Sequence, residues 1–118
     1  LGDFNENPDD ENLKNLLYDE NFNKILTNPY VDLYNNRIFS TFHFKDGLLF
    51  DQIILSNEFY DSNFPFSFKD AKVFNSEKLS TWNRKFSGRP FRTYAGTRYL
   101  GGYSDHFPVL TEFIKRNN

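Results

Sequence analysis

A pair of strand-like runs joined by a turn signal is the sequence feature that most restricts the fold. Residues 38–44 are rich in β-branched and aromatic side chains, and residues 49–55 form a second, mostly apolar run. Between them, Lys45-Asp46-Gly47 contains the Asp-Gly pair that favours a tight turn. These segments predict a β-hairpin, so we expect the chain to contain a sheet.

One charged side chain interrupts the second run, where Asp51 lies between Phe50 and Gln52. A carboxylate in a buried strand costs free energy unless another group pairs with it. The sequence therefore predicts that Asp51 has a partner from another part of the chain.

Further strands are predicted on both sides of this hairpin, at residues 1–4, 71–74 and 107–114, with a helical turn at 76–82. Residues 83–103 are expected to form a long irregular loop. Loops of that length in a small domain often carry function.

A helix is predicted after the first strand. Pro8 suits a first helical position, and three leucines follow at helical spacing: Leu13, Leu16 and Leu17. The first turn of this helix is acidic, with Asp9, Asp10 and Glu11. The positive end of the helix dipole explains these carboxylates without a metal ion.

The composition is typical of a single globular domain. The 118 residues include 15 Phe, 7 Tyr and 1 Trp, a ring content that disordered segments lack. No apolar run reaches the roughly 18 residues of a membrane-spanning helix. The absence of Cys excludes disulfides, thiolate zinc sites and cysteine nucleophiles. Because the chain has no Met and opens with Leu1, we expect it to derive from a longer polypeptide.

Charge is separated along the chain, although the total is only −2. Residues 1–59 carry 4 basic and 11 acidic side chains, a net charge of −7, whereas residues 60–118 carry 10 basic and 5 acidic, a net charge of +5. Two interpretations are open. The charged side chains form ordinary solvent-exposed surface, or they form a site in which acidic side chains bind a cation and basic side chains at its edge bind an anion.

Three short polar motifs contain the candidate site residues: Gly2-Asp3-Phe4-Asn5, Phe50-Asp51-Gln52-Ile53 and Ser104-Asp105-His106. Each motif is weak alone, but together they supply the groups that metal-assisted phosphoester hydrolysis needs. The carboxylates of Asp3 and Asp105 suit a hard divalent cation such as Mg²⁺ or Mn²⁺. Asn5 adds an amide that can orient a water or a phosphate oxygen.

His106 is the candidate for moving a proton or for donating to a phosphate oxygen near neutral pH. Such an imidazole needs a carboxylate that fixes its ring, and Asp51 on a neighbouring strand is available. The sequence therefore predicts an Asp51-His106 pair. Whether Asp3 or this pair acts as the general base stays open. No role is assigned to His43.

These motifs resemble those of the endonuclease/exonuclease/phosphatase superfamily, the metal-dependent phosphoesterases with a deoxyribonuclease-like fold. Gly2-Asp3-Phe4-Asn5 is similar to the family's Gly-Asp-Phe-Asn box, which implies that Asp3 orients or activates the attacking water and that Asn5 contacts the phosphate. The segment around Asp51 is similar to the one whose Asp holds the catalytic histidine. Residues 104–109 resemble the closing Ser-Asp-His-x-Pro-Val box, which implies a metal role for Asp105 and a phosphate contact for His106.

The resemblance implies an α/β (α+β) fold, namely half of a four-layer α/β/β/α sandwich. Residues 1–118 would be its C-terminal half, one mixed β-sheet with helices on its outer face. The family's first-half Asn, its metal-binding Glu and its Tyr or His at the phosphate are not among these residues. We therefore expect the inner sheet face to be covered. The missing N-terminal half of the same domain or a second copy of the chain would cover it.

Five cations lie shortly before the last motif, with no acid among them: Arg84, Lys85, Arg89, Arg92 and Arg98. Because arginine forks match phosphate oxygens, Arg92 and Arg98 are candidates for binding the substrate phosphate. A solvated basic loop is the alternative.

The favoured function is Mg²⁺- or Mn²⁺-dependent hydrolysis of a phosphoester, phosphodiesterase- or nuclease-like, on nucleic acid or another phosphorylated substrate. Asp3, Asn5, Asp51 and His106 are the predicted catalytic residues. One alternative is a catalytically silent fragment or scaffold that lacks the N-terminal metal ligand. Another is a nucleic-acid-binding module, which the basic loop favours and the net charge does not. Substrate identity and localisation stay open.

Overall fold

The computed structural model describes residues 1–82 and 87–117, which form short helices and short strands. The helical elements are α1 (Glu11–Leu16), α2 (Tyr30–Asn35) and the 3-10 helices η1 (Asn57–Tyr60) and η2 (Glu77–Leu79). The strands are β1 (Gly2–Asp3), β2 (Leu26–Thr27), β3 (Thr41–His43), β4 (Asp46–Leu48), β5 (Asp51–Gln52), β6 (Leu55–Ser56), β7 (Phe66–Val73), β8 (Tyr94–Ala95), β9 (Arg98–Tyr99) and β10 (Val109–Lys115).

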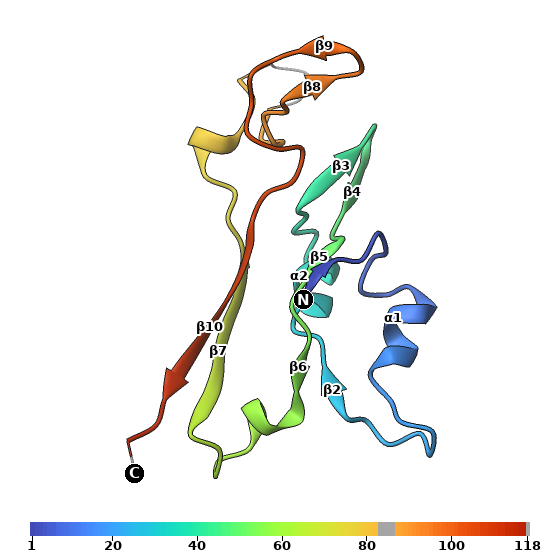
Figure 1. Ribbon diagram of the computed structural model, residues 1–118, viewed down its shortest axis with the longest axis vertical. Coiled ribbons are helices and arrows are strands. Elements are labelled where there is room, and N and C mark those ends of the chain that lie inside the picture. Colours follow the sequence, from blue (N-terminus) through green and yellow to red (C-terminus); the bar gives the residue numbers. More distant parts are fainter. Residues whose placement is uncertain (83–86, 118) are drawn as a thin grey trace.

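The longest paired element is an antiparallel ribbon of β7 and β10, which forms one side of the molecule (Figure 1). Its register runs from Val73 opposite Val109 to Phe66 opposite Lys115. Both strands predicted in this part of the sequence are confirmed, and β7 begins earlier than predicted. The helical turn predicted at residues 76–82 is present as η2.

A hairpin forms at this place, but its predicted pairing of residues 38–44 with residues 49–55 is wrong. β3 pairs with β4, which contains the Asp-Gly pair that was predicted as the turn. His43 lies opposite Asp46, so Phe44 and Lys45 form the turn. Phe44 has a φ of 53°, the left-handed conformation that the common two-residue hairpin turns use at their first position. Gly47 lies inside β4 instead of in the turn.

The second predicted run is divided between two other strand pairs. β5 pairs with β1, so that Gly2 lies opposite Gln52 and Asp3 opposite Asp51. β6 pairs with β2. The strand predicted at the start of the chain is thereby confirmed, and its partner is the strand that carries Asp51.

Helix α1 begins later than predicted. Its N-cap is Asp10, whereas Pro8 is buried in the turn that precedes the helix. Leu13 and Leu17 are buried, and Leu16 is half exposed. The apolar stripe of this helix is therefore narrower than its leucine spacing indicated.

Helix α2 has no counterpart among the sequence predictions, yet it supplies the centre of the core. Tyr30 at its start forms one buried cluster with Leu49 and Ala71. The Tyr30 hydroxyl donates to the carbonyl oxygen of Leu110 in β10, at 3.0 Å. This helix therefore connects the ribbon to the other side of the molecule.

The segment predicted as an irregular loop contains a second hairpin, of β8 and β9, at one end of the molecule (Figure 1). Tyr94 lies opposite Tyr99, and their ring centroids are 5.5 Å apart in an edge-to-face arrangement. Gly96 between these strands has a φ of 60°, which glycine adopts without steric cost. Residues 83–86 of the predicted loop lie outside the described residues.

The α+β class is confirmed by this mixture of short helices and small antiparallel sheets. Each described sheet has two strands. The single mixed sheet and the four-layer sandwich therefore stay predictions. None of the described helices has the length and hydropathy to span a membrane.

Candidate catalytic site

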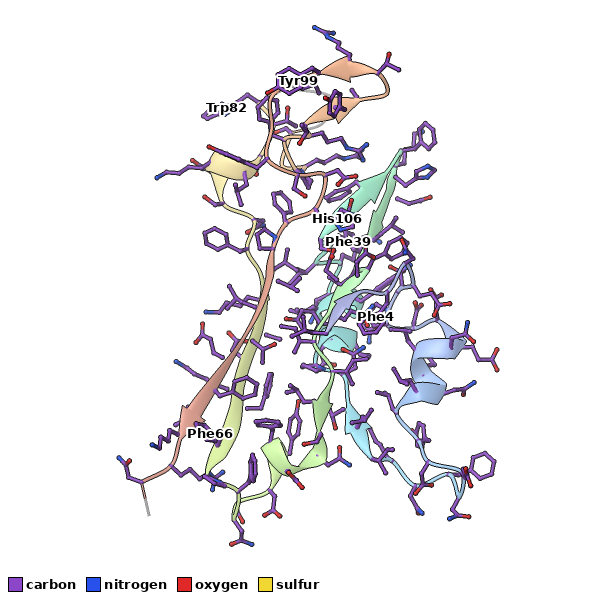
Figure 2. The ribbon with its side chains drawn as sticks, in the orientation of Figure 1. Phe4, Phe39, Phe66, Trp82, Tyr99 and His106 are labelled. Carbon is purple, nitrogen blue, oxygen red and sulfur yellow. The ribbon has the colours of Figure 1, made fainter. Side chains whose placement is uncertain are left out.

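Three of the predicted site residues converge in the middle of the molecule. The pairing of β1 with β5 places Asp3 opposite Asp51, and the segment leading into β10 brings His106 to them. Each residue offers one ligand atom, and these atoms all lie within 4.8 Å of one another. In Figure 2, His106 lies below the end of the molecule where Tyr99 is labelled.

A buried polar network fixes the strand that carries Asp51. The side chain of Gln52 has no exposed surface, and its Nε2 donates to the carbonyl oxygens of Glu6 and Leu49, each at 2.8 Å. Its Oε1 accepts a hydrogen bond from Asn28 Nδ2 at 2.7 Å. Because the amide is satisfied on both its nitrogen and its oxygen, the backbone next to Asp51 is held in one position.

The predicted contact between Asp51 and His106 is present. Asp51 Oδ2 lies 2.6 Å from His106 Nδ1, and the two side chains are 18% and 26% exposed. An ionised carboxylate only accepts hydrogen bonds, so Nδ1 carries the proton. The ring therefore keeps Nε2 available for a substrate or a water.

Ser40 is a site residue that the sequence reasoning missed. Its Oγ donates to Asp51 Oδ2 at 2.6 Å, and the residue has no exposed surface. The signal in the sequence is a hydroxyl residue inside a run of β-branched and aromatic residues. A polar group in such a run needs a hydrogen-bond partner once it is buried.

Asn5 lies directly after β1, in a left-handed conformation with a φ of 54°. Its backbone N–H donates to Asp3 Oδ1 at 3.0 Å, which closes a local turn. Both side chains are exposed at the end of the strand. The structure therefore keeps the backbone of Asn5 beside the carboxylate of Asp3.

Asp105 lies at the edge of this cluster. Its Oδ1 is 3.9 Å from His106 Nε2, and its side chain is 61% exposed. Its backbone carbonyl accepts a hydrogen bond from Thr41 Oγ1 at 2.7 Å. Ser104 Oγ accepts a hydrogen bond from the His106 N–H at 3.0 Å, so this hydroxyl shapes the turn.

The arginines of the basic segment have different environments. Arg92 donates from Nη2 to the carbonyl oxygen of Phe42 at 2.7 Å, and Arg89 donates to that of Phe44. These bonds attach the segment to the β3–β4 hairpin. Arg98 is exposed on β9, near the end of the molecule that lies away from His106. The predicted cations Arg84 and Lys85 lie outside the described residues.

A hollow of about 330 Å³ opens beside the convergent residues. Asp3, Asp51 and His106 contribute its polar part. Ile53 and Val109 contribute to its apolar part. A small molecule can therefore enter the site from the solvent, through the hollow between β5 and the start of β10.

The donor atoms of the site fit a hard divalent cation. Carboxylate oxygens are the ligands that Mg²⁺ and Mn²⁺ accept in proteins, and Asp3 presents an exposed carboxylate. Asp51 engages its Oδ2 with Ser40 and His106. Asp3 therefore has the most exposed carboxylate of the three-residue group, and the carboxylate of Asp105 lies 3.9 Å from His106 Nε2.

Comparison with known families gives a match over nearly the whole chain. Residues 1–115 match the Endonuclease/Exonuclease/phosphatase family. Comparison with curated proteins and with solved structures gives no match. The matched range contains all three polar motifs and every residue of the site described above. This chain belongs to the endonuclease/exonuclease/phosphatase family.

Proposed function

We propose that this chain supplies the catalytic groups of a metal-dependent phosphoester hydrolase, phosphodiesterase- or nuclease-like, in which water attacks phosphorus. Membership of the family supports a phosphoesterase-type function. The observation that carries the finer proposal is the 2.6 Å contact of Asp51 with His106 beside Asp3. It places an oriented imidazole next to an exposed carboxylate, as proton transfer at a metal-assisted site needs.

His106 has two roles in this proposal, and Asp51 supports both. In the charged ring, Nε2 donates to the scissile phosphate, and in the neutral ring the same atom accepts a proton. Asp51 holds the ring orientation and stabilises the imidazolium form. The proton of the attacking water goes either to Asp3 or to His106, and comparing variants of these two residues distinguishes the routes.

Asp3 and Asp105 are the residues that would hold Mg²⁺ or Mn²⁺ in this proposal. Such an ion polarises a phosphoryl oxygen and offsets the charge that develops during attack. Asn5 contributes an uncharged amide that hydrogen-bonds to a phosphate oxygen. Arg92 donates one of its five guanidinium N–H groups to Phe42, and in this proposal other N–H groups of the same side chain bind a phosphate oxygen.

The first experiment is hydrolysis of a chromogenic phosphodiester by the full-length protein that contains this chain, with Mg²⁺, with Mn²⁺ and with EDTA. We expect turnover that requires the metal and that falls by about 10²-fold or more in Asp3→Ala and in His106→Ala. His43→Ala is the matched control, because His43 lies exposed on the β3–β4 hairpin. A folded Asp3→Ala or His106→Ala variant with most of its activity would contradict the proposal.

A catalytically silent fragment is the second candidate. Among the described residues, the group around His106 contains two carboxylates, and Asp51 already holds the imidazole and the Ser40 hydroxyl. In this reading residues 1–118 are the C-terminal half of a domain, and the chain by itself turns over nothing. Salt-dependent binding of nucleic acid without hydrolysis would instead support a binding module.

A further inference from the structure

Ser40 is a buried polar side chain beside Asp51 to which the proposed chemistry gives no task. Its hydroxyl lies 2.6 Å from Asp51 Oδ2, the same oxygen that accepts the hydrogen bond from His106 Nδ1. Buried serines commonly satisfy their hydroxyl on a backbone carbonyl. This hydroxyl instead donates to an ionisable side chain, which makes it part of the Asp51-His106 arrangement.

The backbone of Ser40 also reaches the histidine segment. Its carbonyl oxygen accepts the N–H of Phe107, the residue after His106, at 2.7 Å. Its own N–H donates to the carbonyl of Leu48 at 2.9 Å, so its position is fixed by the β3–β4 hairpin. One residue therefore contacts the carboxylate through its side chain and the imidazole segment through its main chain.

Thr41 extends this arrangement to the other side of the histidine. Its Oγ1 donates to the carbonyl oxygen of Asp105 at 2.7 Å, and the residue is almost fully buried. The residues before and after His106 are thus both bound by neighbouring residues of one strand segment. These contacts fix the backbone of His106 independently of its ring.

We propose that Ser40 is a positioning residue that selects the catalytic orientation of Asp51 and, through it, the Nδ1-protonated form of His106. The expected effect of Ser40 on turnover rests on the proposed function. Its expected effect on the position of the His106 ring proton does not. Two donors on one carboxylate oxygen remove the rotational freedom of Asp51, since a turn about its last torsion breaks both bonds. Without the hydroxyl, the carboxylate rotates and both imidazole tautomers become populated.

A purely structural Ser40 makes different predictions. Loss of its hydroxyl would then lower thermal stability while the imidazole and the chemical step stayed unchanged. The measurements that separate the two roles are therefore the position of the His106 ring proton and the division of any activity loss between kcat and KM.

The ring proton is read from ¹H–¹⁵N correlation spectra at an alkaline pH, where imidazoles are neutral. His106 is assigned by its absence from the spectrum of His106→Gln, and exposed His43 serves as an internal reference. We expect one dominant Nδ1-protonated signal set in the unsubstituted protein and a mixture of tautomers in Ser40→Ala. Ser80→Ala is the matched control, because it removes a hydroxyl that donates to the carbonyl of Ser76.

The kinetic arm uses the full-length protein, the chromogenic phosphodiester and Mn²⁺. We expect Ser40→Ala to lower kcat roughly 10-fold or more and to change KM less than about twofold, as for other residues that orient a catalytic group. Ser40→Thr, which keeps the hydroxyl, should restore most of kcat. If Ser40→Ala does not fold, Ser40→Cys fills the same space with a weaker donor and should give an intermediate tautomer mixture.

The two arms fail separately. An unsubstituted protein without turnover would contradict the proposed function, while the ring-proton spectra would still test Ser40. A folded Ser40→Ala protein with the Nδ1-protonated His106 of the unsubstituted protein, and with unchanged kcat where turnover exists, would overturn the positioning role. An equal fall in kcat in Ser40→Ala and in Ser40→Thr would overturn the positioning role as well.

Discussion

Tyr30 joins helix α2 to the strand that leads away from the site. Its buried hydroxyl donates to the carbonyl oxygen of Leu110 at 3.0 Å and lies 3.1 Å from Thr111 Oγ1. We expect Tyr30→Phe to lower the free energy of unfolding by about 1–2 kcal/mol, because the acceptor loses its partner. Urea denaturation at pH 7 measures this loss. Tyr18→Phe is the control, since Tyr18 is half exposed.

The same side chain gives a pH dependence with a definite sign. Burial raises the pKa of Tyr30 above the ordinary tyrosine value of 10.0. The unfolded chain therefore loses this proton at a lower pH than the folded protein does, so stability falls as the pH rises above 10.0. The fall should be smaller in Tyr30→Phe than in the unsubstituted protein. Equal pH dependence of the two proteins would contradict this account.

Some residues of the candidate site could be predicted from the sequence and others could not. The need of Asp51 for a partner could be predicted, because a charge within an apolar run has a known cost. Ser40 could not be identified in this way. A serine is compatible with both surface and interior, and its partner depends on which strands pair. The buried amide of Gln52 was missed for the same reason, since its partners Glu6 and Asn28 come from distant segments.

At the scale of elements, the β3–β4 hairpin depends on the contact of Gly47 with Phe39. A Cβ at Gly47 would stand 2.0 Å from the Phe39 ring, and that ring meets Tyr34 and Phe42 edge-on, each at 5.9 Å between centroids. Because the ring is held on two sides, we expect Gly47→Ala to lower the free energy of unfolding by about 1–3 kcal/mol. Urea denaturation measures the change.

A double-mutant cycle assigns that cost to the ring. Phe39→Ala removes the ring atoms that a Cβ would meet, so the loss caused by Gly47→Ala should be smaller in the Phe39→Ala background. Since Phe39 precedes Ser40, we also expect Gly47→Ala to lower activity in the full-length protein. Additive effects of the two substitutions on stability would show that the ring is not the cause.

Elements with local signals were predicted, and elements stabilised by distant contacts were missed. A hairpin that begins with residues 38–44 was predicted from its turn signal and strand composition, but its second strand is Asp46–Leu48, and the predicted second strand pairs with β1 and β2 from distant parts of the chain. Helix α2 has six residues and no strong apolar periodicity, and the burial of Tyr30 against Leu49 and Ala71 accounts for it. The β8–β9 hairpin was missed because each strand has two residues, although Gly96 marks its turn.

The chain as a whole has a larger accessible surface and a larger radius of gyration than a compact domain of the same mass. A monomer of 14.1 kDa exposes about 6,700 Å² by the usual scaling with mass, whereas this chain exposes 8567 Å². Its radius of gyration is 16.6 Å, against about 13.5 Å for a compact domain of 118 residues. The surplus of roughly 1,900 Å² is about twice the ~800 Å² that each partner buries in a standard protein interface.

This openness agrees with the proposed role as half of a domain. Large apolar side chains remain exposed on both sides of the molecule, among them Leu16 of α1 and, on the ribbon, Phe66 and Ile114. Surface of this kind in a soluble protein is normally covered by other protein. The resemblance to the family predicted that other protein covers the apolar sheet face. The strand pairs among the described residues leave large apolar side chains exposed.

We therefore expect the isolated chain of 118 residues to associate in solution. Light scattering over a concentration series should give masses above 14.1 kDa that rise with concentration, because association buries apolar surface. Sulfate should promote association further, since it strengthens apolar burial. Thr97→Ser, at an exposed polar position in the turn between β8 and β9, is the control and should leave the masses unchanged. A monomer that keeps its circular dichroism at every concentration would contradict the expectation. It would also remove the main physical support for a chain that requires a covering partner.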